Sequence, residues 1–254
     1  MTTPPAARRP PTVPAAALVH VYTAVGAVLA FWMVVAAFEG RTTTVLWLFL
    51  VAMVIDGSDG LLARRLRVKE AIPGFDGALL DNIVDYLTYC FAPMLLLWAD
   101  GRLPGGAVGA VLASLPMLAS SYGFCRSDAK TEDHFFLGFP SYWNILAFYV
   151  VVLELSPTVT GVLVAVFAVL VFVPVKYVYP SRTENWWWTN MAATAAWFAA
   201  YAVITVQLPD PNVVLVGLSL AYVAFYTVES LMLTLRRRRT DPASSSAAAP
   251  APSA

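Results

Sequence analysis

Apolar residues dominate this chain in long runs that are nearly free of charge. The runs cover residues 18–38, 44–55, 86–99, 106–124, 141–155, 158–179, 186–207 and 212–235. About 20 apolar residues, rising 1.5 Å each, cross the roughly 30 Å of hydrocarbon in a bilayer. Backbone polar groups in lipid must find partners within their own segment, so such runs are expected to be helical. The pattern predicts an all-α integral membrane protein with eight transmembrane helices.

Composition agrees with a membrane domain. Of 254 residues, 59% are hydrophobic and 13% are charged, which is about half the charged share of soluble domains. Cys90 and Cys125 have no metal-ligand spacing and indicate no disulfide framework. We expect a membrane domain over residues 14–239, between disordered cytosolic tails at 1–13 and 240–254. The formal net charge is zero, and we expect membrane lipid as a partner but no nucleic acid.

Basic residues sort to one side of the predicted membrane. Eight spans place both termini on the same side, together with every Lys and Arg except Arg41 and Arg102. The positive-inside rule assigns that side to the cytosol. This separation also supports the count of eight spans, because removing one span would mix the two groups.

Acidic residues gather in the second predicted span. Asp56 and Asp59 are three residues apart and therefore share a helix face. Gly60, Ala63 and Arg64 follow at four, seven and eight residues from Asp56, on the same stripe. Two carboxylates thus lie beside small residues and one guanidinium.

A second acidic stripe opens the third predicted span. Gly77, Asp81 and Asp85 follow one another at steps of four. Consecutive spans run antiparallel, so these two carboxylates and those of Asp56 and Asp59 are expected at one depth, in the cytosolic half of the membrane. The sequence therefore predicts a site with four carboxylates.

Four carboxylates in an apolar setting would take up protons unless cations neutralise them. Oxygen-only ligation suits Mg²⁺ or Mn²⁺. Two such ions about 4 Å apart can clamp phosphoryl oxygens in displacement chemistry. The small residues Gly60, Ala63 and Gly77 allow close helix approach or leave room for a nucleobase, and Arg64 could pair with a phosphate.

Two other interpretations of the carboxylates remain open. Intramembrane carboxylates also serve as structural groups or line a proton or cation path. A divalent-cation transporter would leave Gly60, Ala63 and Arg64 without a role, and the sequence shows no inverted repeat of the kind common in transporters.

The two stripes carry a recognisable motif. Asp56-x-x-Asp59-Gly60-x-x-Ala63-Arg64 followed by Gly77-x-x-x-Asp81-x-x-x-Asp85 resembles the signature of the CDP-alcohol phosphotransferase family. Twelve residues separate Arg64 from Gly77, more than in most of that family. This longer gap, the segment 120–149 and the eight predicted spans resemble the bacterial phosphatidylcholine synthase branch.

The resemblance implies a six-helix family core plus extra helices, a homodimer, and a location in the bacterial inner membrane with the active site facing the cytosol. It implies transfer of the phosphatidyl group of CDP-diacylglycerol to choline, with release of CMP. Serine, inositol or glycerol phosphate remain alternative acceptors, although the scarcity of basic residues favours an uncharged or cationic alcohol.

The resemblance also assigns roles to residues. Asp56, Asp59 and Asp81 would bind metal, and Asp85 would contribute to the second metal and act as general base. The CDP-diacylglycerol contacts would be Gly60, Ala63, Arg64 and Gly77. The cofactor would be two ions of Mn²⁺, with Mg²⁺ as a substitute.

Choline needs a different kind of receptor. Its quaternary ammonium donates no hydrogen bond, so aromatic faces are its natural partners. The candidates are Tyr86, Tyr142 and Trp143. Tyr and Trp also form belts at membrane interfaces regardless of function, which is how we interpret Trp186 to Trp188. Glu229, in the last predicted span, is expected to form a hydrogen bond with a neighbouring helix.

Overall fold

The structure is a computed structural model that describes residues 12–126, 128, 135–178 and 187–240, without the side chains of 235–240. Almost all of the two predicted tails lies outside the described residues. The elements, in chain order, are α1 (Val13–Phe38), α2 (Thr42–Arg65), α3 (Val68–Ala71), α4 (Gly77–Asp85), the π-helical η1 (Tyr86–Phe91), α5 (Ala92–Ala99), α6 (Gly106–Cys125), β1 (Phe135–Leu137), α7 (Trp143–Val152), α8 (Pro157–Leu170), β2 (Lys176–Val178), α9 (Trp187–Val206) and α10 (Val213–Thr240).

Most of the described chain is helical, as predicted from its apolar runs. Among the residues that the structure describes, six helical segments are long and apolar enough to cross a membrane, namely α1, α2, the continuous segment Gly77–Ala99, α6, α9 and α10. The helices α7 and α8 have only 10 and 14 residues, which correspond to about 15 and 21 Å. The protein is therefore a multi-pass membrane protein, while eight full spans stay a prediction.

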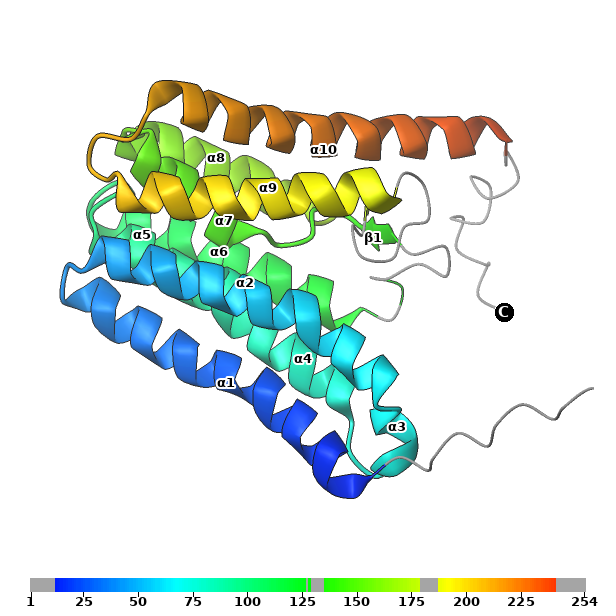
Figure 1. Ribbon diagram of the computed structural model, residues 1–254. Helices are drawn as coiled ribbons and strands as arrows, with labels where there is room; N and C mark the ends of the chain where they lie inside the picture. The colour runs from blue at the N-terminus through cyan, green and yellow to red at the C-terminus, as the bar shows by residue number, and fades with distance from the viewer. Residues whose placement is uncertain (1–11, 127, 129–134, 179–186, 241–254) are drawn as a thin grey trace, which may run out of the picture.

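The helices form two groups around one large apolar core (Figure 1). On one side, α1 packs along α2 and against α4 and α5. On the other side, α10 lies along α9 and β2. Between them the core contains fully buried Phe49, Trp143, Phe148 and Tyr201, and the rings of Phe148 and Tyr201 stack with centroids 3.8 Å apart.

The prediction of one continuous helix over 158–179 is wrong. The helix α8 ends at Leu170, and β2 pairs antiparallel with β1, with Phe136 opposite Tyr177. Pro174 lies between α8 and β2 and disfavours a continued helix, because it lacks the backbone N–H and its ring clashes with the preceding turn. The two short strands are a local addition to a helical fold.

Hydroxyl groups of α10 bind the backbone of β2. The Val178 N–H donates to Ser230 Oγ at 3.1 Å, and the Lys176 N–H donates to Thr234 Oγ1 at 3.0 Å. The Tyr226 hydroxyl donates to the Val178 carbonyl at 2.9 Å. These three α10 side chains are four residues apart and share one helix face. The strand is thus paired on one edge by β1 and on the other by side chains.

Two local features fix the position of α4. The Asp76 side chain accepts hydrogen bonds from the N–H groups of Ala78 and Leu79, each at 3.0 Å, as a capping Asp does at a helix start. At Gly26, α1 comes so close to α4 that a Cβ would collide with the Val84 side chain. The cap sets where α4 begins, and the glycine sets how near it lies to α1.

We expect Gly26→Ala to lower the free energy of unfolding by about 1–3 kcal/mol, because overpacking a tight contact costs that much. A matched control is Gly57→Ala on α2, where an added Cβ meets nothing within 4 Å and the gain in helix propensity is roughly 0.5–1 kcal/mol. Thermal unfolding in detergent measures both. Equal stabilities for the two variants would contradict the close α1–α4 contact.

Candidate active site

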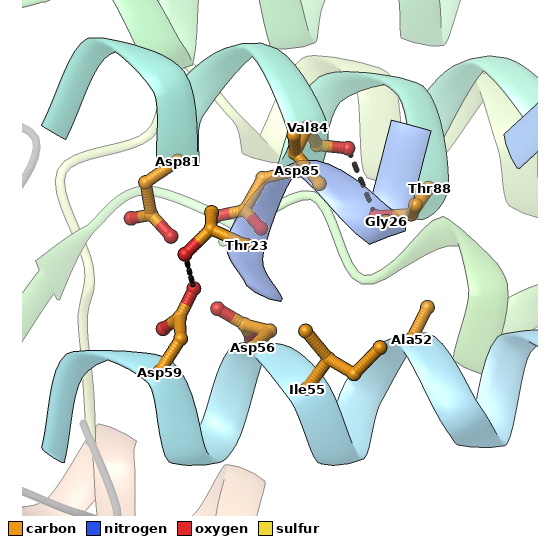
Figure 2. Close-up of a pocket in the computed structure, with 10 residues that line it drawn as sticks. All are labelled: Thr23, Gly26, Ala52, Ile55, Asp56, Asp59, Asp81, Val84, Asp85 and Thr88. Carbon is orange, nitrogen blue, oxygen red and sulfur yellow. Dashed lines mark hydrogen bonds between the residues drawn. The ribbon is translucent and has the colours of Figure 1, made fainter. Parts of the chain in front are cut away.

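A pocket opens between α1, α2 and the α4–η1 segment (Figure 2). Four carboxylates line it, with small and apolar side chains around them. The lining residues are Thr23 and Gly26 of α1, Ala52, Ile55, Asp56 and Asp59 of α2, and Asp81, Val84, Asp85 and Thr88 of the α4–η1 segment. The two predicted acidic stripes therefore face one another.

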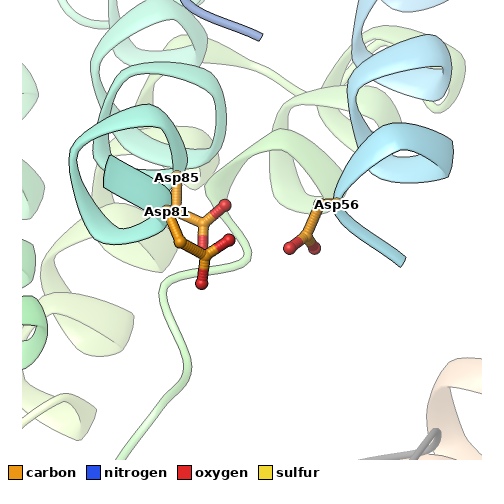
Figure 3. Close-up of side chains that lie close together, drawn as sticks. All are labelled: Asp56, Asp81 and Asp85. Carbon is orange, nitrogen blue, oxygen red and sulfur yellow. The ribbon is translucent and has the colours of Figure 1, made fainter. Parts of the chain in front are cut away.

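Three of the carboxylates form a compact cluster. Asp56, Asp81 and Asp85 each offer an oxygen that lies within 4.8 Å of the others, and Figure 3 shows them pointing together across the gap between α2 and α4. Oxygens bound about 2.1 Å from one Mg²⁺ are at most about 4.2 Å apart. The cluster is close to that spacing, so these residues fit a hard divalent cation.

Asp59 lines the same pocket but is not part of this three-residue cluster. Its Oδ2 accepts a hydrogen bond from Thr23 Oγ1 of α1 at 2.7 Å, and both side chains are buried. The carboxylate is therefore held beside the cluster by a different helix.

Asp56 has an aromatic partner. The Tyr89 hydroxyl of η1 donates to Asp56 Oδ2 at 2.6 Å. The Tyr89 ring lies 6.0 Å from the ring of Tyr142, which in turn lies 6.5 Å from the ring of Phe136 and 6.3 Å from that of Tyr226. A chain of aromatic rings thus begins at one carboxylate of the cluster.

The predicted nucleotide contacts lie toward the end of α2 and the start of α4. Gly60 faces its own helix neighbour Arg64, whose side chain is exposed. Ala63 packs against a small buried cluster of α1 and α3. At Gly77, a Cβ would lie 2.7 Å from Cε1 of His20. The structure gives Ala63 and Gly77 a role in close helix packing, and their contact with CDP-diacylglycerol stays a prediction.

The three choline candidates have different surroundings. Tyr142 lies in the ring chain that reaches Asp56 through Tyr89. The Tyr86 hydroxyl donates to the Met117 carbonyl at 3.3 Å. Trp143 is fully buried, and its indole N–H donates to Ser120 Oγ at 2.8 Å. The structure therefore brings Tyr142 toward the carboxylates and places Trp143 in the core.

Sequence reasoning missed three residues of this region. Thr23 and Tyr89 bind carboxylates, and His20 packs against Gly77 with its buried Nε2 lacking a hydrogen-bond partner among the described residues. A signal existed for α1, because the run 18–38 contains the polar residues His20 and Thr23, with Gly26 three residues after Thr23. The predicted helix–helix bond of Glu229 is confirmed, since Asn190 Nδ2 donates to Glu229 Oε1 at 3.3 Å.

Comparison with known proteins places these residues in a family. The family model for CDP-alcohol phosphatidyltransferase matches residues 16–240 of the chain. The chain belongs to the CDP-alcohol phosphatidyltransferase family. The match extends from α1 to the end of α10 and includes both acidic stripes, so the whole helical fold is the family domain and the protein is a transferase of phosphatidyl groups.

Curated relatives resemble the chain over most of its length. A phosphatidylcholine synthase of Legionella pneumophila is 41% identical over 227 residues, which is 87% of this chain and 89% of the relative. One of Pseudomonas aeruginosa is 38% identical and covers 82% and 87% of the two chains. One of Borreliella burgdorferi is 32% identical and covers 87% and 95%.

For this CDP-alcohol phosphatidyltransferase, the contact between Gly77 and His20 gives a direct test. We expect Gly77→Ala to lower the unfolding temperature, because the imidazole must move away from the new methyl group. When His20→Ala is already present, adding Gly77→Ala should lower the unfolding temperature less than it does in the unchanged protein, because the imidazole is absent. Thermal unfolding in detergent, without substrate, measures each variant. If Gly77→Ala lowered the unfolding temperature equally with and without His20, a contact other than His20 would be what excludes the methyl group.

Proposed function

We propose that this protein is a phosphatidylcholine synthase that transfers the phosphatidyl group of CDP-diacylglycerol to choline and releases CMP. The family membership supports the phosphatidyl transfer. The names of the relatives support choline as the acceptor. The observation that carries the proposal is the convergence of Asp56, Asp81 and Asp85 from two helices on one pocket.

The carboxylates of Asp56, Asp59, Asp81 and Asp85 would hold two divalent cations, Mn²⁺ with Mg²⁺ as a substitute. Bound there, such ions neutralise phosphate charge and stabilise the CMP leaving group. The donor set fits this role, because it consists of carboxylate oxygens, which hard cations prefer.

The residues of the chain perform the remaining steps. Asp85 takes the proton of the choline hydroxyl as that oxygen attacks the phosphorus bonded to diacylglycerol. The bond from this phosphorus to the oxygen of CMP breaks, and CMP leaves. Arg64, exposed near the end of α2, pairs with a phosphate of the nucleotide, and Gly60, Ala63 and Gly77 shape the cradle that receives it.

The ammonium group of choline would be received by aromatic faces. Tyr142 carries most of this assignment, because its ring lies among those of Tyr89, Phe136 and Tyr226, and Tyr89 in turn binds Asp56. Tyr86, directly after Asp85, and Trp143, directly after Tyr142, complete the proposed set. A cation within about 6 Å of a ring centre gains roughly 0.5–2 kcal/mol.

The proposed setting is the bacterial inner membrane, with a membrane domain over 14–239 in a homodimer and eight spans. The orientation rests on charge. Arg64 and Arg65 lie in the last turn of α2 and Arg67 follows it, whereas Arg41 and Arg102 lie at the opposite helix ends. The positive-inside rule then turns the carboxylate pocket and both termini toward the cytosol.

The first experiment is CMP release by purified protein in detergent, with CDP-diacylglycerol, Mn²⁺ and one alcohol at a time. We expect release with choline that a chelator abolishes and added Mn²⁺ restores. Release with serine, inositol or glycerol phosphate instead would keep the carboxylate chemistry and replace the acceptor. No release with any alcohol, from folded protein, would contradict the proposed function.

The assignment of Asp85 as general base makes a separate prediction. We expect Asp85→Asn to slow CMP release by about 10²–10⁴-fold, the usual contribution of a general base, while binding of CDP-diacylglycerol persists. Activity is measured by CMP release, and binding by the ligand-induced rise in unfolding temperature. Loss of lipid binding in this variant would make Asp85 an essential metal ligand rather than a base.

A further inference from the structure

Each of the two α2 aspartates is hydrogen-bonded by a hydroxyl from a different element. Thr23 of α1 donates to Asp59 Oδ2 at 2.7 Å, and Tyr89 of η1 donates to Asp56 Oδ2 at 2.6 Å. Distances this short are typical of a hydroxyl bound to a charged carboxylate. Thr23, Tyr89 and Asp59 are only 6–7% exposed, and Asp56 is half-buried. The Thr23–Asp59 bond is therefore buried, and the Tyr89–Asp56 bond is partly buried at the pocket.

The packing of the helices keeps these hydroxyls in place. Thr23 lies three residues before Gly26, on the same face of α1, so the close approach of α1 to α4 at Gly26 also fixes the height of the Thr23 hydroxyl. Tyr89 lies inside η1, the π-helical stretch that begins directly after Asp85. Such stretches occur frequently at functional sites and reorient the side chains that follow.

We infer that Thr23 and Tyr89 are positioning residues that orient Asp59 and Asp56 for metal binding. The inference rests on the metal-assisted function proposed above. Each hydroxyl engages Oδ2 and so fixes the rotation of the carboxylate and the direction of Oδ1. A neutral hydroxyl does this without cancelling the negative charge that attracts a cation. Groups that orient metal ligands in this way typically contribute about 10–100-fold to metal affinity.

Tyr89 contacts both the proposed metal site and the proposed acceptor site, and a single substitution can distinguish the two contacts. Its hydroxyl binds Asp56, whereas its ring lies against Tyr142, the main residue of the proposed choline site. Tyr89→Phe removes the first contact and keeps the second. We expect this variant to need more Mn²⁺ for CMP release, with an unchanged KM for choline at saturating Mn²⁺.

The decisive experiment measures Mn²⁺ binding to the detergent-purified protein without substrates, from the loss of the free Mn²⁺ signal in electron paramagnetic resonance. The variants are Thr23→Val, which has nearly the same shape but no hydroxyl, Thr23→Ser, which restores the hydroxyl, and Tyr89→Phe. Matched controls are Thr205→Val and Tyr201→Phe, which remove buried hydroxyls that donate to the backbone carbonyls of Tyr201 and Leu46. Unfolding temperatures identify variants that fail to fold.

We expect Thr23→Val and Tyr89→Phe to weaken Mn²⁺ binding at least about 10-fold, while Thr23→Ser and both controls bind like the unchanged protein. Normal Mn²⁺ binding by Thr23→Val and Tyr89→Phe would overturn the inference and leave the proposed function standing. Equal weakening in the controls would also overturn it, since any lost buried hydroxyl would then suffice. Absence of Mn²⁺ binding by the unchanged protein would overturn the metal site itself, and the inference with it.

Discussion

Negative charge inside an apolar helix bundle is the constraint on which the rest of this structure depends. Four carboxylates share one pocket between α1, α2 and the α4–η1 segment, and like charges this close together repel one another. Three of them converge within 4.8 Å. Such an arrangement persists in a membrane protein where cations and hydroxyl donors compensate the charge, and phosphoryl transfer uses both the charge and the cations. The fold can be understood as the framework that brings these carboxylates together.

The framework works because small residues lie where the helices must approach. Gly26 lets α1 touch α4 at Val84, and Gly77 lets the start of α4 pass beside His20. Asp76 caps α4 and so places Asp81 and Asp85 on its second and third turns. The motif glycine Gly77 is therefore explained by packing as well as by any nucleotide contact, and the acidic stripe depends on residues that are not themselves acidic.

The carboxylate cluster could be predicted from the sequence, because spacings of three and four residues fix a helix face without knowledge of the fold. The hydrogen-bond partners of these carboxylates could not be predicted from the sequence. Thr23 reaches Asp59 only because of the rotation of α1, and Tyr89 reaches Asp56 from a π-helical stretch, which shifts side chains away from the expected 3.6-residue period. The burial of Trp143 and its bond to Ser120 could not be predicted either, because they depend on how α6 and α7 pack against each other.

The segment 171–178 shows why hydropathy alone misassigns such regions. An apolar run is expected to be helical in a membrane because lipid offers no partners to a free strand edge. Here both edges of β2 have partners, β1 on one side and the hydroxyls of Tyr226, Ser230 and Thr234 on the other. Hydroxyl side chains four residues apart on one face of α10 bind the backbone of β2. The residues of β2 can therefore satisfy their backbone polar groups without forming a helix. The ring centroid of Tyr226 also lies 6.3 Å from that of Tyr142. The residue that binds the strand backbone therefore also contributes a ring to the proposed acceptor site.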